Sequence, residues 1–277
     1  MHSKRWIGNL GFPEGPRWHR GRLWFSDFGD CLVRAVDSNA QVTEVARVSA
    51  RPSGLGWLPD GALLVVSMND RRLLRVSESG SVEHADLSSF TDFSCNDMVV
   101  DPRGNAYVGH FGLDLFAQPL QPKPASLLLV RPDGSVTVAA PDLLFPNGVV
   151  LGEDGRTLIV AETFGGRLTA FDVAEDGTLS GRRVFAALPG RAPDGICIDR
   201  EGAIWVADAA GKSCVRVREG GAVTDTVTTE QRCYACVLGG ADGRTLFLCT
   251  ADGYDATSMA KHNASIETVQ VDVPGPT

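Results

Sequence analysis

Six dipeptides at related positions along the chain carry the residues with the most evident chemistry. They are Glu14-Gly15, Ser53-Gly54, Asn96-Asp97, Asn147-Gly148, Asp194-Gly195 and Tyr234-Ala235. Four of the six first residues, Glu14, Asn96, Asn147 and Asp194, are carboxylates or carboxamides. If they converge, the carboxylates repel each other unless a positive charge lies between them. The set therefore predicts one divalent metal ion, and oxygen ligands without His or Cys favour calcium, magnesium or manganese over zinc.

A structural explanation of the same residues is open, because Asp and Asn before Gly form turns in many proteins. Two features favour the metal site over it. The polar residues share one aligned position, and proline precedes three of them, at Pro13, Pro146 and Pro193. A proline restricts the backbone that enters each position.

An internal repeat positions these residues. The dipeptides begin at residues 14, 53, 96, 147, 194 and 234, a spacing of 39 to 51 residues. Each module consists of short apolar segments separated by glycine turns such as Asp154-Gly155 and Glu201-Gly202, without an amphipathic helical stretch. This period is typical of a β-propeller with four-stranded blades. The sequence predicts an all-β, six-bladed β-propeller that forms a single domain over residues 1–277.

The last module ends one strand short, and residues 3–8 precede the first module. We expect this N-terminal strand to close the sixth blade, because closure removes the open sheet edges of the ring. Strand direction alternates within a four-stranded meander. We therefore expect the first residue of each module to lie on the same face of the ring as the loop after the second strand. The glycine turns are expected on the opposite face.

Composition limits the partners. The chain has 277 residues, 43% of them hydrophobic, and a formal net charge of −8. A chain of this sign is not expected to bind nucleic acid or an anionic membrane surface. Neither a spanning apolar run nor a signal peptide is evident, which predicts a cytoplasmic protein. The expected partner is a small molecule, and the expected state is a monomer or small homo-oligomer.

The seven cysteines do not resemble a disulfide framework, because their number is odd and they are scattered through predicted strands. Cys233 and Cys236 have CxxC spacing, but a second pair and a nearby His are missing. Burial as small apolar side chains is therefore favoured over a metal or redox role.

Four segments in blade order resemble the SMP-30/gluconolactonase (regucalcin-like) family, namely residues 12–18, 95–104, 145–150 and 193–199. The resemblance implies a six-bladed propeller with one divalent metal ion in its channel that hydrolyses lactones or related esters. It implies that Glu14, Asn147 and Asp194 are metal ligands, that Asn96 is a fourth ligand or a substrate contact, and that Asp194 is the general base. Calcium is the expected ion, with manganese, magnesium or zinc as alternatives.

One position departs from the family. Its sugar-lactone hydrolases carry an arginine that contacts substrate two residues before the asparagine that matches Asn96, whereas this chain has Ser94, which we expect at the substrate site. A substrate less polar than gluconolactone is therefore expected. Apolar residues of the loops on the same face are candidates for contact with it: Phe28, Met68, Phe111, Phe116, Phe164, Tyr254 and Met259.

His110 follows a predicted strand and is a candidate to contact substrate or relay a proton, although a hydrogen-bonded structural role is the alternative. Glu162 and Asp208 end second strands in the same way, and we expect them to bond to loops. The loops 110–125 and 251–264 are the longest, and long loops over a site often act as lids.

These observations favour a metal-dependent lactonase or esterase that acts on a small, fairly apolar substrate through metal-activated water and a carboxylate base. Motifs of serine hydrolases and zincins are missing from the sequence. The alternatives are a non-catalytic propeller that binds a metal or small ligand and a phosphotriesterase-like hydrolase.

Overall fold

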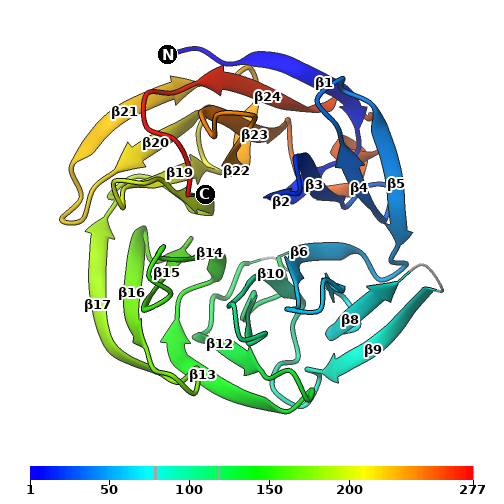
Figure 1. The fold of residues 1–277 in the computed structure, drawn as a ribbon, viewed down its shortest axis with the longest axis vertical. Coiled ribbons are helices and arrows are strands. Elements are labelled where there is room, and N and C mark those ends of the chain that lie inside the picture. The colour runs from blue at the N-terminus through cyan, green and yellow to red at the C-terminus, as the bar shows by residue number, and fades with distance from the viewer. Residues whose placement is uncertain (78–79, 116, 118, 277) are drawn as a thin grey trace.

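The computed structural model contains six antiparallel sheets of four strands each, arranged in a ring around a common axis (Figure 1). It describes residues 1–77, 80–115, 117 and 119–276. The predicted six-bladed β-propeller is confirmed. In each blade the first strand of the module lies innermost and later strands lie progressively farther out, so the predicted chemical residues begin the strands nearest the channel.

The first three blades follow the chain without crossover. Their strands are β2 (Pro13–His19), β3 (Arg22–Asp27), β4 (Leu32–Val36) and β5 (Val42–Arg47); β6 (Pro52–Trp57), β7 (Leu63–Ser67), β8 (Arg72–Ser77) and β9 (Gly80–Asp86); and β10 (Cys95–Val100), β11 (Ala106–His110), β12 (Ala125–Val130) and β13 (Val136–Leu143).

The remaining blades repeat the arrangement. Their strands are β14 (Pro146–Leu151), β15 (Thr157–Glu162), β16 (Arg167–Val173) and β17 (Leu179–Ala187); β18 (Pro193–Ile198), β19 (Ile204–Asp208), β20 (Ser213–Val217) and β21 (Val223–Thr228); and β22 (Arg232–Gly239), β23 (Thr245–Ala251) and β24 (Ala264–Gln270), which are joined by β1 (Lys4–Leu10).

The N-terminal strand closes the ring as predicted. β1 pairs antiparallel with β24, with Lys4 opposite Thr268 and Leu10 opposite Ala264. The residues before β1 also bond to the fifth blade, where the backbone N–H of Ser3 donates to Thr228 O at 3.1 Å. The first ten residues thus join the last two blades, so the ring has no gap at the point where the chain begins.

The glycine turns lie between first and second strands, at the end of each blade away from the predicted site. Gly21, Gly61, Gly104, Gly155, Gly202 and Gly243 all have positive φ, from 64° to 92°. Such a backbone strains side chains other than glycine. Aspartates complete several turns by accepting backbone bonds, as Asp154 does from Arg156 N at 2.9 Å.

A second group of glycines allows the innermost strands to approach each other closely. A Cβ on Gly148 would lie 2.5 Å from Ile196 N of the fifth blade, and one on Gly195 would lie 2.6 Å from Ala235 Cα of the sixth. Gly54 is crowded in the same way by Met98 N at 2.4 Å. Blade packing therefore requires glycine at residues 54, 148 and 195, and this close packing brings Ser53, Asn147 and Asp194 near the channel axis.

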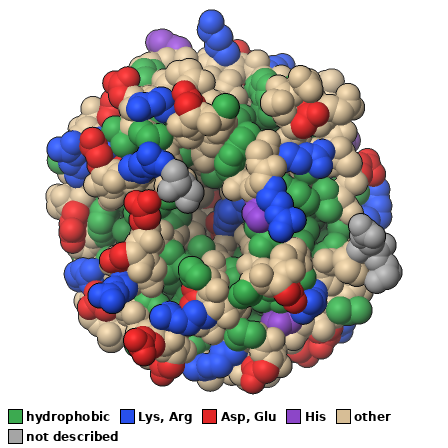
Figure 2. All heavy atoms as spheres, viewed as in Figure 1, with side chains coloured by type: hydrophobic (Ala, Val, Ile, Leu, Met, Phe, Trp, Pro, Cys, Tyr) green, Lys and Arg blue, Asp and Glu red, His purple; other side chains and the backbone are tan. Residues whose placement is uncertain are grey.

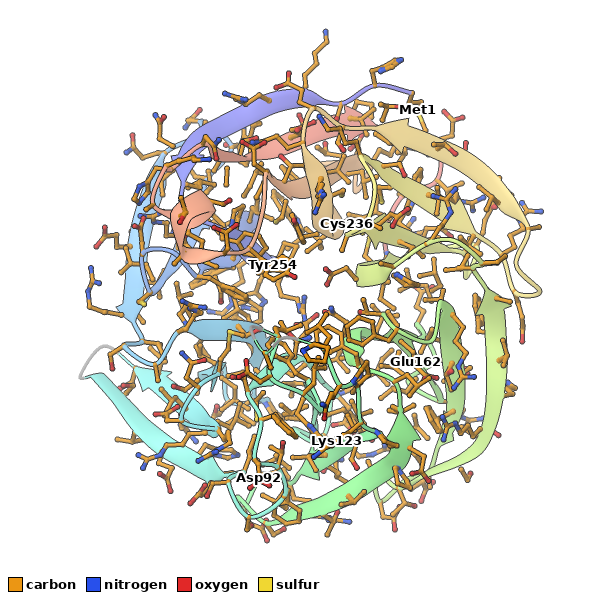
Figure 3. The ribbon with its side chains drawn as sticks, turned by 180° about the vertical axis from the view of Figure 1, so that it is seen from behind. Met1, Asp92, Lys123, Glu162, Cys236 and Tyr254 are labelled. Carbon is orange, nitrogen blue, oxygen red and sulfur yellow. The ribbon has the colours of Figure 1, made fainter. Side chains whose placement is uncertain are left out.

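Apolar side chains fill the space between blades, where the largest fully buried ones are Trp205, Tyr107 and Phe25. All seven cysteines are free, as expected. Cys236, labelled in Figure 3, has its Sγ 3.8 Å from that of Cys197 in the neighbouring blade. Within the described residues, the four-residue α1 (Ala256–Met259) is the only helix, and no helix has the length and apolar character of a membrane span.

Replacing Gly148 with alanine is expected to destabilise the fold by about 1–3 kcal/mol, because the new methyl group would overlap the backbone of β18. Gly8→Ala is the matched control, since its nearest neighbour would be Arg5 Cδ at 3.5 Å. Urea denaturation of both variants measures the difference in free energy of unfolding. Equal stability of the two variants would contradict the packing role of Gly148.

Candidate active site

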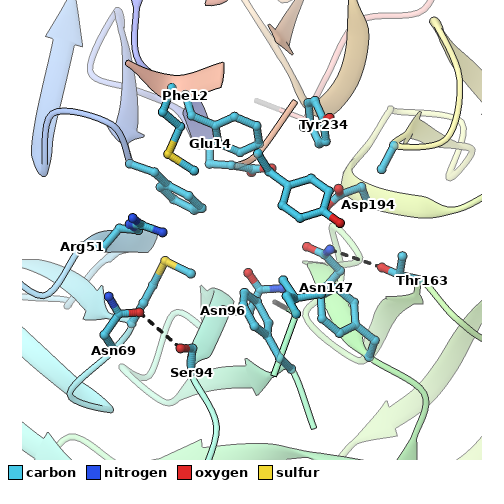
Figure 4. A pocket seen from close by; sticks show the side chains of 18 of the residues that line it. Phe12, Glu14, Arg51, Asn69, Ser94, Asn96, Asn147, Thr163, Asp194 and Tyr234 are labelled. Atoms are coloured by element: carbon cyan, nitrogen blue, oxygen red, sulfur yellow. Dashed lines mark hydrogen bonds between the residues drawn. The ribbon is translucent and has the colours of Figure 1, made fainter. Parts of the chain in front are cut away.

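A cavity of about 190 Å³ opens at one end of the channel. Glu14, Asn96, Asn147 and Asp194, the four predicted oxygen ligands, all line it (Figure 4). The opposite end carries the C-terminal segment, where Gly275 N donates to Gly243 O at 2.9 Å. Figure 2 shows that opposite face, which is hollowed at its centre and bears charged side chains of both signs. The structure thus brings together residues that are up to 180 positions apart in the sequence.

Hydrogen bonds orient the amide of Asn147. Its Nδ2 donates to Thr163 Oγ1 at 3.2 Å, and Thr163 Oγ1 donates to Pro193 O at 2.8 Å (Figure 4). Asn96 Nδ2 points in a similar way to Pro146 O, at 3.5 Å. Because the nitrogen atoms are directed to the protein, the carbonyl oxygens of both amides remain available to the cavity.

Buried acidic residues at the ends of three second strands accept hydrogen bonds from the backbone just before the innermost strands. Asp27 Oδ1 accepts from Phe12 N at 2.9 Å, Glu162 Oε2 from Leu144 N at 2.8 Å, and Asp208 Oδ1 from Ala192 N at 3.0 Å. The expected loop-bonding role of Glu162 and Asp208 is therefore confirmed.

The acidic side chains at the channel carry an electrostatic cost. Burial raises the pKa of Glu14 to about 8, and the charge of Asp97 adds to this, while the hydrogen bond from Gly15 N opposes it. Burial, followed by the charges of Glu14 and Asp97, raises the pKa of Asp194 well above its usual value. Arg17 Nη2 pairs with Asp97 Oδ1 at 2.6 Å. Asp97 therefore has a cationic partner, whereas Glu14 and Asp194 form no ion pair among the described residues.

The donor set fits a hard divalent cation. It combines two carboxylates with two amide carbonyl oxygens, and calcium binds carboxylate and amide oxygens. Only two of the four donors are acidic, and the described residues contain no group of three His, Cys, Asp or Glu side chains suited to a metal. A cation between Glu14 and Asp194 would favour the ionised form of both carboxyls and so oppose the effect of burial, which raises their pKa values.

Aromatic and thioether side chains form the walls of the cavity. The predicted Phe28, Met68, Phe111, Phe164, Tyr254 and Met259 all line it, and Phe116 lies outside the described residues. Phe12 and Phe145 line it as well and were not predicted. Phe145 stacks on Phe111 with ring centroids 4.9 Å apart and contacts Phe164 at 5.1 Å. The cavity therefore has an oxygen-rich floor and apolar walls.

The long loops contribute to these walls. Phe111 and Leu115 belong to loop 110–125, and Tyr254 and Met259 belong to loop 251–264. In the second loop the Asp255 carboxylate accepts from Ser258 N at 3.0 Å and caps α1. Met259 of this helix is buried. In Figure 3 Tyr254 lies beside the open centre of the ring.

His110 is not among the residues that line the cavity. It is buried, its Nε2 accepts from Ser126 N at 2.9 Å, and its Nδ1 lies 3.2 Å from Thr91 Oγ1. Burial lowers the pKa of His110 to about 4, so the ring is neutral at physiological pH. This geometry matches the structural alternative, and we do not include His110 in the proposed substrate site.

Several residues in or near the cavity were not predicted. Asp97, next to Asn96, occupies the position of the glycine in other modules, and its pairing with Arg17 joins residues 80 positions apart. Arg51, Asn69 and Thr163 line the cavity from loops whose sequences have no distinctive pattern. Ser94 lines it as predicted, and its Oγ donates to Asn69 Oδ1 at 3.2 Å.

The fold and cavity define a six-bladed β-propeller with carboxylate and amide oxygens at the mouth of its channel. The sequence matches the family model described as SMP-30/Gluconolactonase/LRE-like region over residues 12–252. Regucalcin of Xenopus laevis is 30% identical over 251 residues, which cover 87% of this chain and 84% of the regucalcin. The chain belongs to the SMP-30/gluconolactonase/LRE-like family.

Other relatives align over less of their length. The chain spans 57% of regucalcin from Danio rerio, at 30% identity and with 60% of this chain covered. A 6-deoxy-6-sulfogluconolactonase of Pseudomonas putida is 29% identical over 187 residues, 65% of this chain and 62% of that protein.

Solved structures share the fold. A luciferin-regenerating enzyme has a TM-score of 0.83 at 21% identity, covering 97% of this chain and 94% of that one. A calcium-binding regucalcin from Agrobacterium tumefaciens has a TM-score of 0.80 at 20% identity, covering 96% and 92%.

Replacing Glu14 with glutamine is expected to raise the melting temperature of chelator-treated protein at pH 8.5 and to change it little at pH 5. Because the folded pKa of Glu14 is about 8, above its usual 4.5, the folded protein holds this proton more tightly than the unfolded chain. Stability conferred by the protonated carboxyl is present below pH 4.5 and lost as pH rises through 8. Glutamine remains neutral throughout.

Thermal melts from pH 5 to pH 9 measure this effect. Asp172→Asn is the control, because Asp172 is an exposed partner of Arg183 outside the cavity. Equal melting temperatures for wild type and Glu14→Gln across the whole pH range would show that ionisation of Glu14 does not destabilise the folded protein.

Proposed function

We propose that the protein is a divalent-metal-dependent hydrolase that opens the lactone ring, or cleaves a related ester, of a small and largely apolar molecule. The observation that carries this proposal is the oxygen-rich floor of Glu14, Asn96, Asn147 and Asp194 beneath aromatic walls. The names of family members as gluconolactonases and as a calcium-binding regucalcin support it.

Glu14, Asn147 and Asp194 would hold the cation, with Asn96 as a fourth ligand or a substrate contact. When bound, a divalent cation supplies charge that keeps the carboxylates ionised, polarises an ester carbonyl and lowers the pKa of water. Calcium suits these oxygen donors best, and manganese, magnesium and zinc are the alternatives to test.

Asp194 is the proposed general base. A carboxylate oxygen of Asp194 accepts a proton from water as the water oxygen attacks the lactone carbonyl carbon. The bond between that carbon and the ring oxygen then breaks, and the proton passes to the ring oxygen. The product is a hydroxy acid, and the reaction consumes one water. Asn147 opposes the rise in the pKa of Asp194, and Thr163 orients the Asn147 amide.

The aromatic walls position the rest of the substrate. Phe12 and Tyr234 pack together on one side, with ring centroids 4.7 Å apart, and Phe111, Phe145 and Phe164 form the other aromatic group. These rings exclude water around the reacting carbonyl and suit alkyl or aromatic groups. Gluconolactone, which exposes several hydroxyl groups, would leave those groups without partners against these walls.

Calcium is expected to raise the melting temperature of chelator-treated wild-type protein, because a ligand that binds only the folded state stabilises it by mass action. At one hundred times its dissociation constant the gain is about 2.7 kcal/mol. Glu14→Gln should lose most of this gain and Asp172→Asn should keep it. Manganese, magnesium and zinc are compared singly, and failure of all four ions to stabilise the wild type would rule out the metal site.

We expect faster hydrolysis of alkyl lactones and dihydrocoumarin than of gluconolactone, measured by a pH-indicator assay with the stabilising metal restored. Asp194→Asn should lower kcat by at least about 100-fold, the usual contribution of a positioned base, at metal concentrations shown by calorimetry to saturate the variant. Asp172→Asn serves as the control. Metal binding without turnover on any lactone or ester would favour the non-catalytic binding protein, and turnover on phosphotriesters alone would favour a phosphotriesterase.

A further inference from the structure

The Arg51 side chain has no evident structural purpose where it lies. It lines the cavity beside the apolar walls and is only partly exposed. Among the described residues its guanidinium makes neither a hydrogen bond nor an ion pair. The acidic residue Asp97 near the channel pairs with Arg17 instead. A charge withdrawn from water without a partner is unfavourable. Its placement therefore points to a partner that enters the cavity.

The backbone directs this side chain from both ends. Arg51 N donates to Val48 O at 3.0 Å, and Arg51 O accepts from Met68 N at 2.9 Å. Its φ is +74°, a left-handed conformation that is unfavourable for residues other than glycine. Pro52 follows and begins β6. Arg51 thus stands two residues before Ser53, as Ser94 stands two residues before Asn96, so the two side chains enter the cavity from neighbouring blades.

Asn69 supplies a second donor beside Arg51. Its Oδ1 accepts the hydrogen bond from Ser94 Oγ at 3.2 Å, which leaves the Asn69 amide nitrogen available to the cavity (Figure 4). Its backbone is held by Asn69 N donating to Ala50 O at 3.0 Å. A guanidinium and an amide N–H group together offer only donors, which is the complement of an anion.

This donor group is separate from the oxygen-rich floor. Figure 4 shows Arg51, Asn69 and Ser94 on one side of the cavity and Asn147 and Asp194 across from them. A molecule whose ester carbonyl lies over the floor would therefore place its far end near Arg51. The cavity of about 190 Å³ favours a compact, planar anion, and a guanidinium matches a carboxylate with two parallel hydrogen bonds.

We propose that Arg51, with Asn69, binds a carboxylate that the lactone or ester substrate carries at the end remote from the reacting carbonyl. This proposal rests on the proposed function for the identity of the reaction. It makes the substrate a largely apolar ester with a single acidic group, and it assigns Arg51 as a specificity-determining residue.

The test compares two γ-butyrolactones of nearly equal size, one with a carboxymethyl substituent and one with the neutral carboxamidomethyl substituent. Wild-type protein should show kcat/KM at least about 10-fold higher for the acid, since a charge-assisted hydrogen bond contributes roughly 10- to 100-fold. Arg51→Met should bring the ratio of the two values close to one, chiefly through KM for the acid. Arg51→Lys should restore part of the ratio.

Arg75→Met is the matched control, because Arg75 belongs to the same blade but pairs with Asp60 outside the cavity. It should keep the wild-type ratio. The melting temperature of each variant establishes that it folds. If Arg51→Met does not fold, the comparison of wild type with Arg51→Lys provides the test. A wild-type ratio near one, or a ratio unchanged in both Arg51 variants, would overturn the proposal while leaving lactone hydrolysis intact.

A binding measurement separates this proposal from the proposed function. Cyclopentylacetate, which has no ester to hydrolyse, should bind more tightly by calorimetry than cyclopentylacetamide, and Arg51→Met should remove the difference. If this holds while neither lactone is hydrolysed, the anion site is supported and the lactonase function fails. If Arg51→Met binds both compounds as the wild type does, the anion site is refuted, whether or not the lactones are hydrolysed.

Discussion

The close approach of the innermost strands is the constraint on which the site depends. Gly54, Gly148 and Gly195 lie so near the next blade that a methyl group on any of them would overlap its backbone. Because the ring can close only at this spacing, the residue before each glycine is carried to the channel. The convergence of Asn147 and Asp194 is thus a consequence of packing, and the chemistry uses positions that the fold already crowds together.

Crowding also creates the electrostatic demand that a cation would meet. Burial, followed by the charges of neighbouring acids, favours protonation of Glu14 and Asp194 and raises the pKa values of both. Arg17 offsets the charge of Asp97 from the side and leaves the other two carboxylates directed to the cavity. The Thr163 hydroxyl orients the amide of Asn147. The electrostatics of this site and its ligand geometry therefore have one cause: carboxylate and amide oxygens converge where too few cationic side chains lie nearby to balance the acidic charge.

Above this floor the cavity is amphipathic. Aromatic rings from several blades surround it, and Arg51 and Asn69 interrupt them on one side. Ser94, at the position where the family resemblance implies arginine in sugar-lactone hydrolases, donates a hydrogen bond to Asn69. The loss of a charged side chain at residue 94 and the presence of one at residue 51 are thus features of the same part of the cavity. Variation in loop residues on a constant ring is how a propeller changes what it binds.

The sequence by itself determined the repeat, the number of blades, the glycine turns, the closing N-terminal strand and the four oxygen-bearing positions. These features follow from local patterns that recur with a regular period, so one chain contains several copies of the signal. Tertiary structure alone decided that Asp97 pairs with Arg17, that His110 bonds to Ser126 away from the cavity, and that Arg51 enters it. Each depends on the direction of a side chain relative to another blade, and that direction is set by loop backbone and interblade contacts that no local periodicity encodes.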